Sequence, residues 1–193
     1  MKTNKIIAVT GGIGTGKSTV CNMLRKKGYA VFSSDQIVSD LYKKRSVRKI
    51  LKSLFPTAVK GIFLKIDRKE ISKIVFNDKD KLALLTSTIT PLVLKEILSR
   101  VKNQTGMCFA EVPLLFECSY QSEFDGVLII SRPIEDRIES VKKRSNLTEE
   151  EILARINSQF NYDDADLKDY TVIFNDGNLE GLEEKINEYL KII

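Results

Sequence analysis

One glycine-rich run near the N-terminus constrains this chain more than any other feature. Residues 11–18 read Gly-Gly-Ile-Gly-Thr-Gly-Lys-Ser, which satisfies the pattern G-x-x-x-x-G-K-[ST] at every fixed position. The apolar run Lys5 to Val9 precedes it, and a helical pattern from Lys17 to Lys27 follows it. A strand, a glycine loop and a helix in this order bind nucleotide phosphates, so the pattern predicts a P-loop fold.

The residue types in this loop suit contacts with phosphate oxygens. Glycines let backbone N–H groups turn inward, and the helix N-terminus adds partial positive charge. Lys17 is expected to reach the β- and γ-phosphates, and the Ser18 hydroxyl to bind Mg²⁺. A dinucleotide site is disfavoured, because Lys17 stands where its last glycine would be. The expected nucleotide-binding residues are Gly12, Ile13, Gly14, Thr15, Gly16, Lys17, Ser18 and Thr19.

Short apolar runs rich in β-branched residues alternate with helical patterns along the chain. This alternation predicts an α/β fold with a parallel sheet of about five strands and helices on both faces. Ligands of such sheets lie at the carboxyl ends of the strands, so residues that follow the strands are candidate site residues. The predicted strands are Lys5 to Val9, Tyr29 to Ser33, Met107 to Val112, Val127 to Ser131 and Thr171 to Phe174.

Two stretches have the sequence form of a capping box at the start of a helix. Asp67 and Glu70 form one, and Thr148 and Glu151 form the other. The second predicts a helix whose apolar face extends from Ile152 to Phe160.

Composition narrows both the class of protein and its chemistry. The 193 residues are 42% hydrophobic and 30% charged, which is typical of a folded α/β domain. No apolar run approaches the roughly 20 residues needed to cross a bilayer. Three widely spaced cysteines without a CxxC pair disfavour a zinc site or disulfides and favour a cytoplasmic location. Because the chain has no histidine, a general base must be a carboxylate, lysine, tyrosine or cysteine.

The net charge of +5 suits an anionic phosphate substrate as well as a nucleic acid. The chain shows no long basic tract and no RNA-binding aromatic motif. We therefore expect a small-molecule substrate, no nucleic-acid or membrane partner, and a monomer or weak homo-oligomer. A GTPase is disfavoured, because the nearest match to its N-K-x-D motif, residues 77–80, reads Asn-Asp-Lys-Asp.

Several residues after the predicted strands have two open interpretations. Asp35 is either the acceptor of a proton from an attacking hydroxyl or the cap of a helix from Gln36 to Lys43. Glu111 either supports Mg²⁺ or contacts solvent at the strand end. The apolar run Pro113 to Phe116 is either core or the wall of an acceptor site. The basic residues between 137 and 144 belong either to a mobile lid or to a solvated helix face.

Taken together, strings of residues along nearly the whole length of the chain resemble the dephospho-CoA kinase family. The shared strings are Val9 to Thr19, Gly28 to Asp35, Asp67-Arg68 with Val75-Phe76-Asn77, Glu111-Val-Pro-Leu-Leu-Phe-Glu117, Arg144 with Thr148, Arg155-Ile156 with Gln159, and Asn175-Asp-Gly177. The resemblance implies a single P-loop kinase domain over residues 1–193. Within it, residues 60–105 would form a helical acceptor-side region, and residues 134–160 a lid.

The resemblance also implies transfer of the ATP γ-phosphate to the 3′-hydroxyl of the dephospho-CoA ribose. The implied catalytic residues are Asp35, Lys17, Arg144 and Arg137, with Ser18 and Glu111 at the metal. The implied acceptor residues are Asp35, Arg68, Pro113, Leu114, Leu115 and Glu117. Alternatives are another nucleoside or nucleotide kinase, a nucleic-acid kinase, and a nucleotide-binding module without catalysis.

The chain departs from the family pattern at four places. Ser33 replaces the first Asp of Asp-Ala-Asp, Thr90 replaces the His of His-Pro, and Asp169-Tyr170 replaces Ala-Asp. The lid arginine expected one turn before Arg144 falls on Ser140, and either Arg137, one turn further back, or Lys142 and Lys143 could substitute for it.

Overall fold

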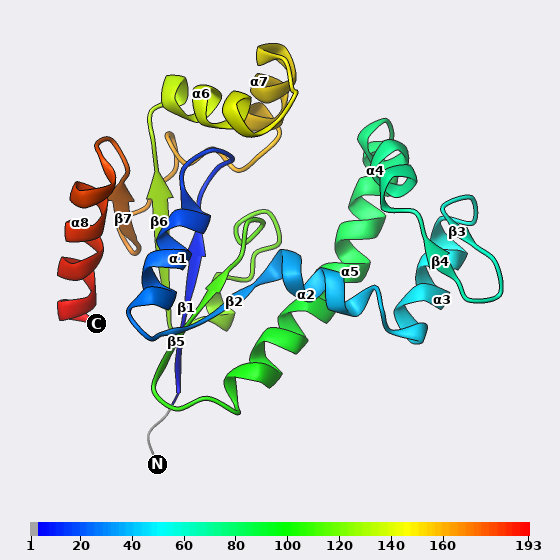
Figure 1. The fold of residues 1–193 in the computed structure, drawn as a ribbon, viewed down its shortest axis with the longest axis horizontal. Coiled ribbons are helices and arrows are strands. Elements are labelled where there is room, and N and C mark those ends of the chain that lie inside the picture. The colour runs from blue at the N-terminus through cyan, green and yellow to red at the C-terminus, as the bar shows by residue number, and fades with distance from the viewer. Residues whose placement is uncertain (1–3) are drawn as a thin grey trace. The chain divides into compact units, whose positions relative to one another are not determined.

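The computed structural model describes residues 4–193, and the chain divides into two compact units (Figure 1). The first unit combines the chain up to Phe32 with Gln104–Ile193. The second unit is Ser33–Asn103, so it begins earlier in the sequence than the acceptor-side region expected over residues 60–105.

A five-stranded sheet forms the centre of the first unit, in the order β2-β5-β1-β6-β7. Strand β1 pairs in parallel with both β5 and β6, and β6 pairs in parallel with β7. This confirms the predicted parallel sheet and each of its strands to within one residue at either end. The bounds are β1 Lys5–Thr10, β2 Ala30–Ser33, β5 Met107–Glu111, β6 Gly126–Ser131 and β7 Thr171–Phe174.

Apolar side chains from the sheet and two helices form the core of this unit. Val9 and Leu128 are fully buried on the central strands, as expected of a sheet covered on both faces. Helices α1 (Lys17–Lys26) and α8 (Leu179–Ile192) pack against the strands through buried side chains such as Cys21. Cys21 is completely buried, and this burial raises the pKa of its thiol to about 12, so the side chain serves in packing.

Helices α6 (Ile134–Arg144) and α7 (Glu149–Asn157) follow β6 and lie beyond its carboxyl end (Figure 1). The predicted capping box is present, with the Thr148 and Glu151 side chains each bonded to the other's backbone N–H. Helix α7 ends at Asn157, so the prediction that its apolar face extends to Phe160 is wrong. Phe160 instead stacks on Phe116, with ring centroids 4.5 Å apart. A short 3₁₀ turn, η1 (Gln121–Glu123), precedes β6.

The second unit is mainly helical, with one small hairpin that the sequence patterns missed. The cap at Asp67 is confirmed, because its carboxylate accepts a hydrogen bond from the Glu70 N–H at 3.1 Å. The Asp67 N–H donates to the carbonyl oxygen of Ala58 at 2.8 Å, so Glu70 does not close the predicted capping box. The two hairpin strands pair in antiparallel fashion through only two residues each, too few for an apolar alternation to be visible. The elements are α2 Ser34–Leu41, α3 Arg45–Leu54, β3 Val59–Lys60, β4 Lys65–Ile66, α4 Arg68–Phe76 and α5 Lys79–Val101.

Helix α5 is the one helix among the described residues that is long and apolar enough to cross a membrane, by length and composition only. Its mean hydropathy over 18 residues is 1.4, although serine, threonine and proline interrupt the apolar run. The prediction that no apolar run comes close to the length needed to cross a bilayer therefore does not hold for α5. One such helix is weak evidence for a membrane span, because core helices of other proteins pass the same test.

Candidate functional site

The P-loop joins β1 to α1, and glycine is required where other parts of the first unit approach it. Gly14 has φ 81°, and a Cβ there would lie 2.6 Å from the carbonyl oxygen of Arg137. Gly16 has φ 98°, and a Cβ there would lie 2.5 Å from Nδ2 of Asn175. Both positions are left-handed and crowded, so any side chain would deform the loop.

Lys17 begins α1 with its ammonium group folded over the loop. Its Nζ donates hydrogen bonds of 2.8 Å to the carbonyl oxygens of Gly11 and Gly12. Burial lowers the pKa of Lys17 to about 8; the carboxylate of Glu111 opposes this shift, and the charges of Arg144 and Arg137 add to it. The site therefore holds a buried cation whose charge Glu111 only partly compensates, which is the electrostatic condition for binding phosphate.

Ser18 and Glu111 meet at the carboxyl ends of β1 and β5. The Ser18 hydroxyl donates a 2.9 Å hydrogen bond to Oε1 of Glu111. Glu111 is the last residue of β5, where the sequence placed a carboxylate near the metal. No group of three histidine, cysteine or acidic side chains in residues 4–193 could hold a metal ion by itself. The donor set fits a Mg²⁺ ion that takes most of its ligands from water and phosphate.

A pocket of about 300 Å³ lies beside the P-loop within the first unit. Residues of the loop and of α1 line one side, and the turn after β7 lines another. Arg144 lines it from α6, as the lid interpretation expected, and Ser140 lines it one turn earlier. Of the expected nucleotide-binding residues, Gly14, Gly16, Lys17, Ser18 and Thr19 face this pocket.

Arg137 lies against the loop and does not line this pocket. Its Nε donates a 3.0 Å hydrogen bond to the carbonyl oxygen of Ile13, and only 7% of the residue is exposed. Burial lowers the pKa of Arg137, which Asp163 and Tyr162 partly offset. In this geometry Arg137 supports the loop through Ile13, and its expected contact with the nucleotide remains a prediction.

The segment after α7 also holds the loop, and two of its residues were missed as supports. The Gln159 side chain accepts a 2.7 Å hydrogen bond from the backbone N–H of Ile13. The Tyr162 hydroxyl lies 3.1 Å from Oγ1 of Thr10. Because the Ile13 N–H already donates to Gln159, this structure does not support the expectation that this N–H binds phosphate. The family resemblance singled out Gln159 without a role, and no pattern marked Tyr162.

Asn175 supports the loop from the end of β7. Its buried side chain donates a 2.9 Å hydrogen bond to the carbonyl oxygen of Thr15. The side chain of Thr15 is itself buried and bonds to the carbonyl oxygen of Gly12 at 2.9 Å, so Thr15 braces the loop from within. The Asn175-Asp-Gly177 string therefore combines a support for the loop with one wall of the pocket.

The apolar run after β5 divides between core and surface. Leu115 is completely buried, as the core interpretation of this run expected, and its implied contact with an acceptor remains a prediction. Phe116 is also buried, within a cluster of aromatic rings. Leu114 is 38% exposed, and Pro113 is partly exposed. Glu117 accepts a 3.0 Å hydrogen bond from the Phe160 N–H, which ties the run to the segment after α7.

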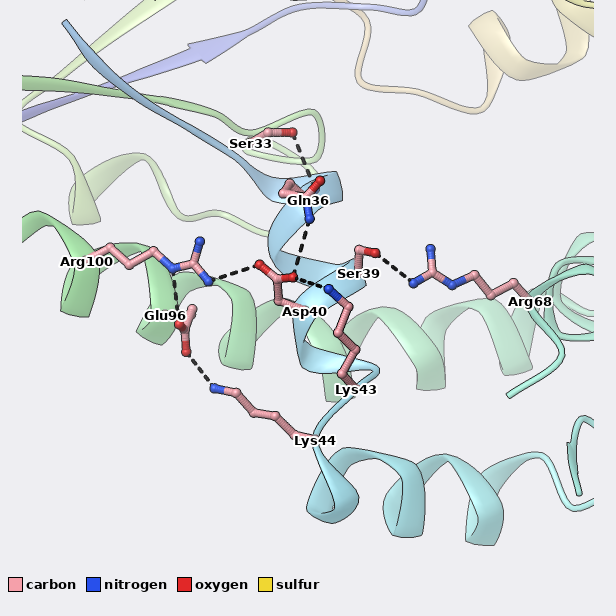
Figure 2. Close-up of polar contacts among 9 residues, drawn as sticks. All are labelled: Ser33, Gln36, Ser39, Asp40, Lys43, Lys44, Arg68, Glu96 and Arg100. Atoms are coloured by element: carbon pink, nitrogen blue, oxygen red, sulfur yellow. Dashed lines mark hydrogen bonds and ion pairs between the residues drawn. The ribbon is translucent and has the colours of Figure 1, made fainter. Parts of the chain in front are cut away.

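In the second unit, Asp35 lies in the first turn of α2 with an exposed side chain. The N-cap of this helix is Ser33, whose hydroxyl accepts a long, 3.5 Å hydrogen bond from the Gln36 N–H (Figure 2). The alternative that Asp35 caps the helix is therefore wrong. The carboxylate at this position does not serve the helix end as a cap, which leaves its proposed chemical role open.

A polar network joins α2 to α5 around Asp40 (Figure 2). Asp40 accepts hydrogen bonds from Lys43 at 2.8 Å and from Arg100 at 3.3 Å. Lys43 first and Arg100 second lower the pKa of the Asp40 carboxyl group. Arg100 also donates a 3.1 Å hydrogen bond to Glu96. The network fixes α2, the helix that carries Asp35, within this unit.

A second pocket, of about 330 Å³, lies wholly within the second unit. Lys43, Arg48, Lys65 and Arg68 line it, and the residues that the structure places around it include no carboxylate. Arg68 donates a 3.0 Å hydrogen bond to the Ser39 hydroxyl, and its guanidinium carbon lies 5.2 Å from the ring centroid of Tyr42. Of the cations in this pocket, sequence reasoning singled out only Arg68.

Similarity to known proteins agrees with this geometry. A sequence model of the dephospho-CoA kinase family matches residues 5–181. A dephospho-CoA kinase of Thermus thermophilus is 37% identical over 188 residues, which cover 96% of this chain and 90% of that protein. That of Fusobacterium nucleatum is 34% identical over 191 residues, which cover 97% and 98%.

Solved structures agree with the fold as well. A crystal structure of a Thermus thermophilus protein has 34% identity and a TM-score of 0.84, covering 98% of each chain. Dephospho-CoA kinase from Campylobacter jejuni has 25% identity and a TM-score of 0.68, covering 98% of this chain and 96% of that one. The P-loop and the similarity along nearly the whole sequence lead to one conclusion: this chain belongs to the dephospho-CoA kinase family.

Proposed function

We propose that this protein transfers the γ-phosphoryl group of ATP to the 3′-hydroxyl of dephospho-CoA and so forms coenzyme A. The observation that carries the proposal is the P-loop with its buried, poorly neutralised Lys17 and the Ser18–Glu111 pair, in a chain of this family. Turnover of ATP with dephospho-CoA, compared with turnover with nucleoside monophosphates, tests it.

Binding of the triphosphate is the task of the first unit. Backbone N–H groups at the start of α1 and the ammonium of Lys17 would hold the phosphates. Ser18 would ligate Mg²⁺, with Glu111 accepting from Ser18 or from a metal-bound water. When bound, Mg²⁺ neutralises charge on the phosphate oxygens. Arg144, which lines the same pocket, would neutralise charge on the transferred group.

Lys17 must change partners when a nucleotide binds. Its Nζ now donates to two loop carbonyl oxygens, and phosphate oxygens would replace them as stronger, charged acceptors. The negative phosphates would also raise the pKa of Lys17 from its value near 8.

This exchange predicts proton uptake on ATP binding above pH 8. At pH 8.5 most Lys17 side chains are neutral before binding and charged after it, so each binding event should take up a fraction of a proton. ATP affinity should fall as the pH rises through 8. Calorimetric titrations at pH 8.5, in two buffers of different ionisation enthalpy, measure the uptake. The Lys17→Met variant should lose it, and equal heats for the wild type in both buffers would refute the assignment.

We propose that Asp35 is the residue that acts on the hydroxyl group of the acceptor. A ribose hydroxyl must lose its proton as the phosphoryl group arrives, and the chain has no histidine to receive it. Asp35 is exposed at the start of α2, next to the end of β2. Ser33, and not Asp35, caps this helix. Its carboxylate would orient the hydroxyl and accept the proton.

The basic pocket of the second unit suits the diphosphate of dephospho-CoA. Its cations include Arg48 and Arg68, whose planar donor groups match phosphate oxygens. Ser39, the hydrogen-bond partner of Arg68, lies four residues after Asp35 and therefore on the same face of α2. A diphosphate bound in this pocket would therefore lie along the face of α2 that also carries Asp35, the proposed base.

We therefore predict that Arg68→Met raises the KM for dephospho-CoA by about 10-fold or more, because a charge-assisted hydrogen bond to phosphate is lost. The KM for ATP and kcat should stay within a few-fold of the wild type, since Arg68 belongs to the acceptor side. Initial rates with each substrate varied in turn measure both constants. Lys49→Met, an exposed cation on α3 outside the pocket, is the matched control. An unchanged KM for dephospho-CoA would show that the diphosphate binds elsewhere.

Two alternative functions would give different results in binding and activity assays. A nucleoside or nucleotide kinase would turn over nucleosides or nucleoside monophosphates faster than dephospho-CoA, and these acceptors rather than dephospho-CoA would raise the melting temperature. A nucleotide-binding module without catalysis, suggested by Ser140 in the lid, would bind ATP and show no transfer at saturating acceptor.

A further inference from the structure

One residue of the P-loop, Ile13, is held at both of its backbone polar groups by side chains from later in the first unit. The Nε of Arg137, the fourth residue of α6, donates a 3.0 Å hydrogen bond to the carbonyl oxygen of Ile13. The side-chain oxygen of Gln159, two residues beyond the end of α7, accepts a 2.7 Å hydrogen bond from the Ile13 N–H. We call these two hydrogen bonds and the three residues that form them the Ile13 clamp.

The glycines on either side of Ile13 also lie against Arg137. A Cβ at Gly12 would collide with the guanidinium group, and a Cβ at Gly14 would lie 2.6 Å from the carbonyl oxygen of Arg137. Only 7% of Arg137 is exposed. Residues 12–14 therefore rest on the side chain and the backbone of one buried residue.

The segment that carries Gln159 is itself fixed at two points. The Phe160 N–H donates a 3.0 Å hydrogen bond to Glu117, and the Tyr162 hydroxyl lies 3.1 Å from Oγ1 of Thr10. Gln159 thus extends from a segment that is tied to the ends of both β1 and β5. The oxygen that binds the loop is held in place from outside the loop.

Support of this kind affects how tightly a loop binds its ligand. A glycine-rich backbone has many accessible shapes, and only the shape that directs its N–H groups at phosphate is competent to bind. The apparent dissociation constant rises as the competent fraction falls, so a loop that is held in shape before binding has the higher affinity.

From these contacts we infer that Arg137 and Gln159 are positioning residues for ATP, which act by holding Ile13 so that the P-loop keeps its phosphate-binding shape. Arg137 does this through the N–H of its Nε and not through its charge. The lid interpretation differs, because it requires the charge of Arg137 to contact the nucleotide. The inference rests on the proposed binding of ATP to this loop.

Three substitutions of Arg137 separate the N–H donor from the charge. Glutamine can place an N–H donor at the chain position of Nε but is uncharged, methionine has neither, and lysine has the charge but a methylene at that position. Calorimetric titration with ATP and Mg²⁺, without an acceptor, measures the affinity of each variant. Arg137→Gln should bind ATP at least about five-fold more tightly than Arg137→Met, the effect of one hydrogen bond, and Arg137→Lys should resemble Arg137→Met.

The second hydrogen bond of the clamp gives an independent test. Gln159→Met removes the acceptor at nearly constant size and should weaken ATP binding by about five-fold. Combined with Arg137→Met it should cost less than the product of the two single effects, because both bonds restrain the same residue. The KM for ATP should rise in the same order among the variants, while the KM for dephospho-CoA stays within about two-fold.

A matched control separates loop positioning from a general loss of stability. Oδ2 of Asp125 accepts a 2.7 Å hydrogen bond from the Ile6 N–H, near the start of β1 and therefore at the end of that strand remote from the loop. Asp125→Ala removes a bond of the same kind and length as the one between Gln159 and Ile13. It should lower the melting temperature and leave the affinity for ATP unchanged.

Other results would overturn the inference. Near-normal affinity in Arg137→Lys, with Arg137→Gln as weak as Arg137→Met, would show that Arg137 acts by its charge. Unchanged affinity in Arg137→Met and Gln159→Met would show that the clamp does not shape the loop, and tighter binding would show that it holds a shape that excludes phosphate. ATP binding without transfer to dephospho-CoA would contradict only the proposed function, whereas a wild type that does not bind ATP would contradict both.

Discussion

Lys17→Ala is expected to lower kcat by at least about 100-fold with dephospho-CoA and ATP. Charge builds on the β- and γ-phosphate oxygens during transfer, and the Lys17 ammonium is the cation that the P-loop places there. Its depressed pKa indicates that burial leaves this charge poorly compensated before a ligand binds, so its interaction with phosphate is not weakened by an existing partner. A coupled assay of ADP release measures the rate.

The fold of this variant should survive, because burying a poorly compensated ammonium does not stabilise the protein. The melting temperature without nucleotide should therefore remain within a few degrees of the wild type, despite the loss of two hydrogen bonds to loop carbonyls. Lys26→Ala, at the exposed end of the same helix, is the matched control and should keep full turnover. Near-normal turnover in Lys17→Ala would mean that the loop does not hold the reacting phosphates.

Asp35→Asn is the second large effect, with an expected fall in kcat of about 100-fold or more. Asparagine keeps the shape of the side chain but cannot accept the proton of the ribose hydroxyl. The KM for ATP should change little, since triphosphate binding is assigned to the first unit. Rates at saturating substrates, together with ATP titrations, separate these effects.

The capping geometry sharpens this prediction. Since Ser33 and not Asp35 caps α2, the exposed Asp35→Asn change should alter the free energy of unfolding by no more than about 0.5 kcal/mol. Asp80→Asn alters an exposed carboxylate in the first turn of α5 and should leave both stability and turnover unchanged. Loss of folding in Asp35→Asn, or an unchanged kcat, would give the role of base to another group.

The sequence predicted the parts of the fold that depend on local patterns. Buried parallel strands are continuous apolar runs, and each of the five was visible as such, including Thr171–Phe174 with its bounds. The P-loop was visible because its chemistry requires fixed residue types at fixed spacing. The Thr148 capping box was visible because both of its partners lie within four residues.

Features that depend on distant contacts were not visible. Arg137 looked like a lid cation, and only the packing of α6 against the loop shows that it bonds to Ile13. The run that contains Leu115 allowed both a core and an acceptor-wall interpretation, and only the three-dimensional core shows that Leu115 is buried. The basic pocket joins Lys43 to Arg68 through folding of the second unit, which no periodicity in the sequence encodes. No sequence pattern singled out Arg132, and only the fold shows that it lines the pocket beside the P-loop.

The position of the transferred phosphate on the product tests the central claim most directly. Purified protein, ATP, Mg²⁺ and dephospho-CoA should yield ADP and a new phosphomonoester in equal amounts, followed by ³¹P NMR. The new resonance and the product mass should match those of coenzyme A phosphorylated at the ribose 3′-oxygen, and Asp35→Asn should form it far more slowly. ADP formation without this product, or preferential phosphorylation of a nucleoside monophosphate, would contradict the account.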